Sequence, residues 1–417
     1  MKLSRLAVPV ALVVLFAACS DDGNGTDTTT GVSTTTLEAT DATEASETSA
    51  DPATTAAPTS TTLTMAELAS AYSEPGPHPV GVTTMQLAKG PLVEVWYPAV
   101  EGTTGTETYD VRDFTPPAIK ALLTGEAAAT YSYAAGRDAD LAEGEHPVVL
   151  FSHGYTGIRL QSTFLTSHLA SWGMIVVSPE HPSRDLTNVL AATASGDRAD
   201  SVDDLLQSLD LITAEDDDPA SLFAGHVDVE HVAAVGHSAG GGTILGAADD
   251  PRVDGYVSLA SGALLRTDTA DTTTTSPPAL PAKPSFFIAG SVDAVVPAET
   301  VTRPSYELAP SPSLLWIIEG VGHNGFDDFC TFGNGTGIIG VADASGLGDL
   351  LDAQPQLRRL GEDGCVPPAV DVTTTFPIID HAVTAWLRHL FGGDAEQMGL
   401  GEEFAGEFAV PVEIAAK

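Results

Sequence analysis

The chain of 417 residues contains 57 Asp and Glu but only 17 Lys and Arg, which gives a formal net charge of −40. Nucleic-acid binding needs clustered Lys and Arg, so we expect no nucleic-acid partner and interpret the acidity as a solvated, self-repelling surface. Hydrophobic residues make up 43% of the chain, which is enough for a substantial core, and the length suits one large α/β domain as well as two smaller ones.

The amino-terminal segment has the pattern of an export signal. Lys2 and Arg5 begin it, an apolar run covers 6–16, and small residues lead to Cys19. The pattern resembles a bacterial lipoprotein signal, in which Cys19 becomes the lipidated first residue of the mature protein. We therefore predict a signal peptide over 1–18, export, and a lipid on Cys19 that anchors the protein to the membrane. An ordinary secretory signal with a free Cys19 is the alternative.

Composition separates three further regions. Residues 19–65 consist mainly of Thr, Ala, Ser, Asp and Glu, which bury too little apolar surface to offset the entropy of ordering, so this stretch is predicted to be a disordered tether. A folded domain is predicted over 66–395. Residues 396–417 are interpreted as an acidic C-terminal tail. After the signal, the sequence contains no apolar run long enough to span a membrane.

Strand and helix patterns alternate through the predicted domain. Apolar or alternating runs predict strands at 80–87, 92–97, 148–152, 174–178, 232–235, 255–259, 285–289 and 314–318. Helical spacing predicts helices at 119–128, 160–172, 199–212, 239–248, 301–308 and 378–391. Strands that alternate with helices form βαβ units, so we predict the α/β class, with a mostly parallel central sheet flanked by helices.

One long segment, 324–376, interrupts this alternation and carries Cys330 and Cys365. Once Cys19 is assigned to the lipid, these two cysteines are an even pair in an exported protein, so we predict a disulfide between them. Two buried free thiols are the alternative. We interpret the segment as an insertion that forms a disulfide-pinned flap over the functional site.

A G-x-S-x-G motif, Gly236–Gly240, lies between the strand pattern at 232–235 and the helix pattern at 239–248. In that context Ser238 lies on a sharp strand-to-helix turn with its hydroxyl projecting from the sheet, and the flanking glycines avoid clashes with neighbouring elements. We therefore predict Ser238 as a nucleophile. Because glycine accounts for 40 of the 417 residues, an accidental motif in a loop is the alternative.

A serine nucleophile needs a base, and the base needs an acid that orients it. Asp293 and His323 each follow an apolar strand, at the edge where α/β sheets build their sites, and complete the chain order Ser, Asp, His. We predict Asp293 as the acid and His323 as the base, with Asp185 and Glu180 as fallback acids. The alternatives are an aspartate that caps a turn and a histidine that only packs.

Acyl transfer also needs N–H donors for the negative oxygen of the tetrahedral intermediate. The N–H of Ala239 begins the helix after the nucleophile, and the N–H of Tyr155 lies in the loop after the strand at 148–152. We predict these two groups as the oxyanion hole. The Tyr155 ring is either a wall of the acyl pocket or a loop aromatic packed on the core.

Several segments resemble known α/β-hydrolases. Those similar to the bacterial cutinase and polyester-hydrolase branch are Phe151–Thr156, Gly236–Gly242, Val292–Pro297 and Gly322–His323, whereas Val95–Ala99 and Glu180–His181 are more similar to platelet-activating-factor acetylhydrolase and dienelactone-hydrolase-like relatives. The resemblance covers about 75–325 and the closing helix. It implies the α/β-hydrolase fold and a serine esterase activity.

The predicted function is an exported serine hydrolase that cleaves carboxylic esters through an acyl-enzyme intermediate. A polyester hydrolase or cutinase and a phospholipid acetylhydrolase are alternatives, and a non-catalytic surface-binding lipoprotein is the alternative outside enzymes. Polyester hydrolases usually carry Met where this chain has Ala239 and Trp where it has the small residues Ser261–Ala263, which argues against a clamp for aromatic polyesters. We expect no cofactor, no metal site and a monomer.

Overall fold

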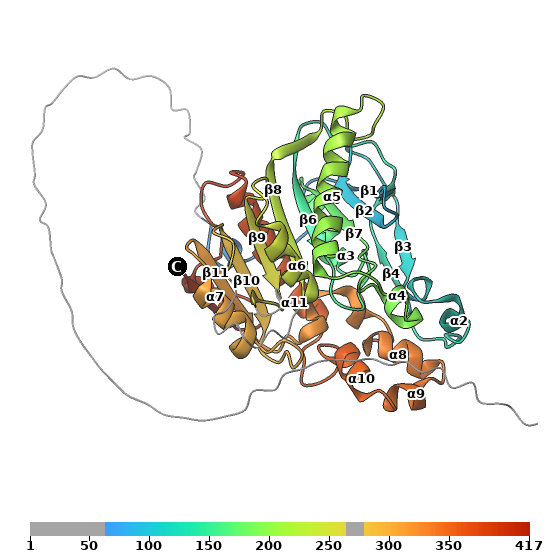
Figure 1. Ribbon diagram of the computed structural model, residues 1–417. Coiled ribbons are helices and arrows are strands. Elements are labelled where there is room, and N and C mark those ends of the chain that lie inside the picture. The colour runs from blue at the N-terminus through green and yellow to red at the C-terminus, as the bar shows by residue number, and fades with distance from the viewer. Residues whose placement is uncertain (1–62, 264–278) are drawn as a thin grey trace, which may run out of the picture. The chain divides into compact units, whose positions relative to one another are not determined.

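Ten strands form one central sheet in the computed structural model, which describes residues 63–263 and 279–417 (Figure 1). Their order across the sheet is β12-β11-β10-β9-β8-β6-β7-β2-β1-β5, and a separate two-stranded sheet pairs β3 with β4. The strands are β1 Val80–Gln86, β2 Leu92–Pro98, β3 Glu107–Asp110, β4 Thr130–Tyr133, β5 Gly136–Arg137, β6 His146–Ser152, β7 Ile175–Pro179, β8 Val227–His237, β9 Gly255–Leu259, β10 Ser285–Gly290, β11 Ser313–Ile318 and β12 Val412–Ala416. The predicted signal peptide, Cys19 and most of the predicted tether lie outside the described residues.

The middle strands of the sheet, from β11 to β7 in sheet order, are all parallel to one another. At the two sides, β12 runs antiparallel to β11 and β2 runs antiparallel to β7. The predicted mostly parallel sheet is therefore confirmed. Because parallel strands end at the same edge of a sheet, the residues that directly follow β6, β8, β10 and β11 gather there.

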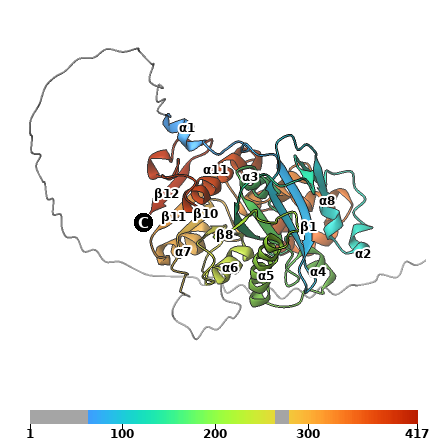
Figure 2. The ribbon, with the colours of Figure 1, turned by 90° about the horizontal axis from the view of Figure 1, so that it is seen from above.

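Helices cover both faces of the sheet, with α3 and α11 on one side and α5, α6 and α7 on the other (Figure 2). The helices are α1 Met65–Ala69, α2 Pro117–Lys120, α3 Thr163–Ser171, α4 Leu186–Ala191, α5 Arg198–Asp217, α6 Ala239–Ala247, α7 Arg303–Leu308, α8 Gly337–Ala344, α9 Gly348–Asp352, α10 Pro355–Glu362 and α11 Val372–Leu390. Within the described ranges, no helix is long and apolar enough to cross a bilayer.

Alternate side chains of each central strand pack into two separate hydrophobic cores, one on each face of the sheet. In β6, Val149 and Phe151 belong to the cluster that includes α3 and α11, whereas Val148 and Leu150 belong to the cluster that includes α5 and α6. Since both faces are covered, the central strands are nearly continuous apolar runs, as the sequence shows. These layers confirm the predicted α/β-hydrolase class.

The predicted helix at 119–128 is wrong beyond its first residues, because α2 ends at Lys120. The chain that follows packs against the insertion, where the N–H of Gly125 donates to Ser345 Oγ (3.0 Å). A Cβ on Gly125 would lie 2.5 Å from the backbone of Ala344. This long-range contact sets the conformation here, and local helical spacing does not.

The end of the chain, interpreted as an acidic tail over 396–417, is part of the domain. Its last residues form β12, which pairs with β11 along its whole length. Val412 and Ile414 are buried while Glu413 between them is exposed. The strand has only five residues, which is too short for its alternation to stand out in the sequence, and the pairing with β11 provides its stability.

The insertion over 324–376 contains two 3-10 turns, His323–Phe326 and Asp328–Thr331, followed by α8, α9 and α10. Figure 1 shows the three helices as one group below the sheet. The predicted disulfide between Cys330 and Cys365 is present, so the alternative of two free thiols is wrong. It joins the second of these turns to the chain that follows α10.

Loss of this disulfide should destabilise the domain. In the chain-entropy model a cross-link that spans 35 residues contributes about 3–4 kcal/mol to the free energy of unfolding. We expect the double variant Cys330→Ser/Cys365→Ser to unfold at a lower urea concentration. Titrations followed by tryptophan fluorescence should show a free energy of unfolding that is lower by this amount. A reducing agent should lower the midpoint of the wild type and leave that of the double variant unchanged. Equal midpoints for the two proteins would contradict the prediction.

Candidate active site

Ser238 lies at the turn between β8 and α6, as the motif predicts. Its backbone is in the left-handed region, with φ at 56°, and its N–H donates to the carbonyl of Leu259 in β9 (2.9 Å). Neighbouring chains approach very closely here: a Cβ on Gly236 would lie 2.5 Å from the carbonyl oxygen of Gly240, and one on Gly240 would lie 1.9 Å from that of Ser152. The turn therefore requires glycine at both positions, because a Cβ would clash there. The motif lies at a strand-to-helix turn, so an accidental motif in a loop is excluded.

Asp293 follows β10 and His323 follows β11, so both reach Ser238 from the same edge of the sheet. His323 Nε2 lies 2.9 Å from Ser238 Oγ, and His323 Nδ1 lies 2.9 Å from Asp293 Oδ2. All three residues are buried, and Ser238 keeps 9% of its surface exposed. The structure thus brings together the three residues predicted as nucleophile, base and acid.

The hydrogen bonds around Asp293 fix the positions of the protons. Asp293 Oδ1 accepts from the N–H groups of Val295 (2.8 Å) and Val296 (2.6 Å), and Oδ2 faces the imidazole. A carboxylate can only accept, so Nδ1 of His323 carries the ring proton. In the neutral ring Nε2 is then free of a proton and accepts from the Ser238 hydroxyl. The arrangement can take the proton of Ser238 Oγ when that oxygen attacks.

The two predicted oxyanion donors lie next to the nucleophile. The N–H of Ala239 is the first of α6 and has no acceptor within the helix, and the N–H of Tyr155 donates to none of the described residues. Gly154, which precedes Tyr155, comes so close that a Cβ on it would lie 3.3 Å from Ser238 Cβ. The Tyr155 side chain is 39% exposed, so it is available as a wall of the site, and the alternative of an aromatic packed on the core is wrong.

The model of the PETase (PET hydrolase-like) family matches residues 127–334. The chain belongs to this family. Its members are α/β-hydrolases that act on carboxylic esters, so this protein is an ester-hydrolysing enzyme and the alternative of a non-catalytic binding lipoprotein is set aside. The matched segment contains Ser238, Asp293 and His323 and ends inside the insertion. A comparison with curated proteins found no match.

Neither of the fallback acids contacts the imidazole of His323 in this PET hydrolase-like chain. Asp185 caps α4 by accepting from the N–H of Asn188 (2.8 Å). Glu180 pairs with Arg159 (3.1 Å), and burial raises the pKa of its carboxyl to about 7 although Arg159 opposes the shift. Among residues 63–263 and 279–417, no group of three or more His, Cys, Asp and Glu side chains is placed to hold a metal ion.

A buried relay of hydrogen bonds, which the sequence did not reveal, links the loop after β6 that carries the Tyr155 N–H, here called the oxyanion loop, to the loop of His323. His237 Nε2 donates to the backbone carbonyl of His323 (3.0 Å), and its Nδ1 accepts from Gln161 Nε2 (2.9 Å). Gln161 Oε1 in turn accepts from the N–H of Gly154 (3.1 Å). Burial lowers the pKa of His237 well below its usual range, so the ring is neutral and one nitrogen is able to accept.

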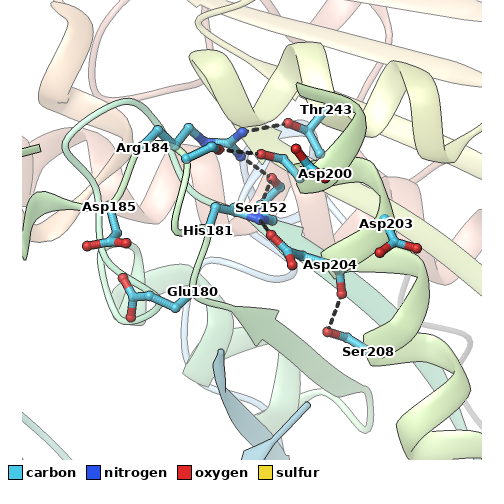
Figure 3. A network of polar contacts seen from close by, with 12 residues as sticks. Ser152, Glu180, His181, Arg184, Asp185, Asp200, Asp203, Asp204, Ser208 and Thr243 are labelled. Atoms are coloured by element: carbon cyan, nitrogen blue, oxygen red, sulfur yellow. Dashed lines mark hydrogen bonds and ion pairs between the residues drawn. The ribbon is translucent and has the colours of Figure 1, made fainter. Parts of the chain in front are cut away.

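A second Ser–His–Asp set lies at the base of the oxyanion loop (Figure 3). Ser152 Oγ is 2.9 Å from His181 Nε2, and His181 Nδ1 is 3.0 Å from Asp204 Oδ2. Burial lowers the pKa of His181 well below its usual range and raises that of Asp204, the latter opposed by the ammonium of Lys89 at 2.7 Å. Ser152 and His181 have no exposed surface, so an ester cannot reach this serine and the set is structural.

Arg184 connects this second set to the helix that follows the nucleophile. Its guanidinium donates to Ser152 Oγ (2.8 Å), to the carbonyl of His153 (3.1 Å) and to Thr243 Oγ1 of α6 (2.9 Å). Figure 3 shows the guanidinium between Ser152 and Thr243. Hydrogen bonds from a charged donor are stronger than neutral ones, and in a buried place they fix geometry. Arg184 therefore holds the start of the oxyanion loop against α6.

Replacing Ser152 by Ala should weaken the fold without removing a reacting group. The change leaves buried His181 Nε2 without its partner, and an unsatisfied buried polar group costs about 1–3 kcal/mol. Urea titration should show that loss in the free energy of unfolding. A control is Ser167→Ala, because the Ser167 hydroxyl is only partly buried and donates to the carbonyl of Thr163 within its own helix. If both variants were as stable as the wild type, the structural role of the buried set would be wrong.

Proposed function

We propose that this PET hydrolase-like enzyme hydrolyses carboxylic esters through Ser238, His323 and Asp293. The supporting observation is the pair of 2.9 Å contacts that join Ser238 Oγ to the imidazole and the imidazole to the Asp293 carboxylate. Ser238 acts as the nucleophile and His323 as the general base and then the general acid. Asp293 orients the ring and stabilises its charged form.

The reaction proceeds in two halves. Ser238 Oγ attacks the carbonyl carbon while its proton moves to His323 Nε2, and the oxyanion accepts from the N–H groups of Tyr155 and Ala239. The tetrahedral intermediate collapses as His323 gives that proton to the departing alcohol, which leaves the acyl group on Ser238. Water then gives a proton to His323 and attacks the acyl carbon, and the second collapse returns the proton to Ser238 Oγ and releases the carboxylic acid.

Small residues near Ser238 leave the site without an aromatic clamp at these positions. Ala239 follows Ser238, and the small residues Ser261–Ala263 follow β9. A Cβ on Gly262 would lie 2.2 Å from Ser305 Oγ, so this position cannot carry an aromatic clamp unless α7 moves. We infer that esters of short acyl chains, acetyl esters of phospholipids among them, react faster than aromatic polyester films. The family match supports polyesters as a second class of substrate.

The variant Ser238→Ala tests the proposed nucleophile. We expect turnover of p-nitrophenyl acetate and butyrate to fall by at least about 10³-fold, because loss of the nucleophile removes the acyl-enzyme route. Covalent labelling by a fluorophosphonate probe should disappear as well. Ser152→Ala is the matched control and should keep the label, since its hydroxyl is fully buried. Turnover at the wild-type rate in Ser238→Ala would refute the proposal.

We also propose that the enzyme is exported and held at the membrane by a lipid on Cys19. The support comes from the sequence: Lys2 and Arg5, the apolar run over 6–16, and the small residues that precede Cys19. Residues 19–65 would then connect the anchor to the domain. A single chain carries all the groups named in the reaction, and we propose that it acts as a monomer.

Cys19→Ser should release the protein from the membrane fraction of a bacterial host. We expect the wild type to incorporate an alkyne-tagged fatty acid and to sediment with membranes, because the cysteine is the site of lipid attachment in this signal. The variant should lose the tag, and Ser20→Ala, as a control, should keep it. A Cys19→Ser protein that still carries the tag would rule out this anchor.

A further inference from the structure

The insertion returns to the candidate site at Asp363, just after α10. Asp363 Oδ1 accepts from the backbone N–H of His323 (2.7 Å), and Oδ2 accepts from the backbone N–H of Ala294 (3.0 Å). His323 is the predicted base, and Ala294 directly follows the predicted acid, Asp293. One carboxylate therefore joins the two loops that carry the base and the acid.

The backbone around Asp363 adds to this contact. The Asp363 carbonyl accepts from the N–H of Asn324 (2.8 Å), and the Asn324 side chain donates to the carbonyl of Leu360 (2.7 Å). A Cβ on Gly322 would lie 2.5 Å from the nitrogen of Gly364. The loop of the base is thus packed directly on the main chain of the insertion at Gly322, and the side chains of Asp363 and Asn324 add hydrogen bonds across the same contact.

Asp363 itself is held from outside the two loops. Its N–H donates to the carbonyl of Arg359 in α10 (3.0 Å), and two residues later Cys365 is bonded to Cys330. Arg358 of the same helix pairs with Asp343 of α8 (2.8 Å). The position of the carboxylate is therefore set by the insertion, so it can hold the loops in place.

We propose that Asp363 is a positioning residue that holds the loops of His323 and Asp293 in register, so that the insertion braces the catalytic groups. This inference rests on the proposed function. The family match ends at 334, so Asp363 lies beyond the residues that the family accounts for. A displacement of about 1 Å of a reacting group lowers rates by up to about a hundredfold, so two hydrogen bonds to loop N–H groups at this point matter for the rate.

The test compares Asp363→Ala, which removes both acceptor oxygens, with Asp363→Asn, which keeps one. For Asp363→Ala we expect kcat on p-nitrophenyl butyrate and the second-order rate of fluorophosphonate labelling to fall about tenfold to a hundredfold, while KM changes by less than about threefold. Asp363→Asn should lie between Asp363→Ala and the wild type. The labelling rate is informative because it depends on the base and involves no deacylation step.

Glu362→Gln is the matched control for these variants. Glu362 is the last residue of α10 and pairs with Arg358 (2.9 Å), and its side chain contacts neither loop. Its kcat and labelling rate should equal those of the wild type. Circular dichroism at the assay temperature establishes that each variant is folded.

The outcomes separate this inference from the proposed function. Wild-type labelling in a folded Asp363→Ala protein overturns the positioning role, and so does failure of both Asp363 variants to fold, because the carboxylate would then serve folding alone. A drop in rate for Glu362→Gln equal to that for Asp363→Ala overturns it as well. Turnover that persists in Ser238→Ala would instead refute the proposed function.

Discussion

The left-handed backbone of Ser238 is the constraint on which the candidate site depends. A non-glycine residue in a sparsely populated backbone region costs about 1–3 kcal/mol and persists only where its surroundings determine it. Here the N–H of Ser238 bonds to Leu259, and Ser261 Oγ donates to the Ser238 carbonyl (2.7 Å). Gly236 and Gly240 let the neighbouring chains close on the turn in direct backbone contact. The hydroxyl is thereby aimed at the edge of the sheet where the other two side chains arrive.

His323 is fixed through its peptide groups as well as its ring. Its N–H donates to Asp363 and its carbonyl accepts from His237, so the two contacts come from the insertion and from the motif of the nucleophile. Through Gln161 the same relay reaches the loop that carries the Tyr155 N–H. The histidine in this relay is neutral because burial lowers its pKa well below the usual range, and burial also raises the pKa of Asp327, whose carboxyl lies 3.7 Å from His237 Nδ1. The residues proposed as nucleophile, base and oxyanion donor are therefore connected by hydrogen bonds that do not involve the atoms proposed to react.

Sequence patterns predicted those residues whose position in the fold follows from the strand or helix next to them in the sequence. Ser238, Asp293 and His323 each follow an apolar strand, and the parallel sheet alone brings such residues to one edge. Patterns fail where the partner is distant. The strand β12 depends on pairing with β11, the segment after α2 depends on contact with α8, and Asp363 accepts from two loops that precede it by 40 and 69 residues. At these positions the deciding partner is distant in the sequence, and local periodicity does not identify it.

A serine bonded to a histidine that is bonded to an aspartate is not enough for catalysis. The described residues contain two such sets. Ser152 and Ser238 each bond to a histidine that bonds to an aspartate, with similar distances. Ser152 ends a strand in extended backbone, has no exposed surface and accepts from the Arg184 guanidinium, so one lone pair of its oxygen is occupied and no ester can approach. Ser238 has an exposed edge and stands directly before the first N–H of a helix, where a developing negative charge is stabilised. Access and an adjacent helix N–H, which the strained turn provides together, are what separate the proposed catalytic set from the structural one.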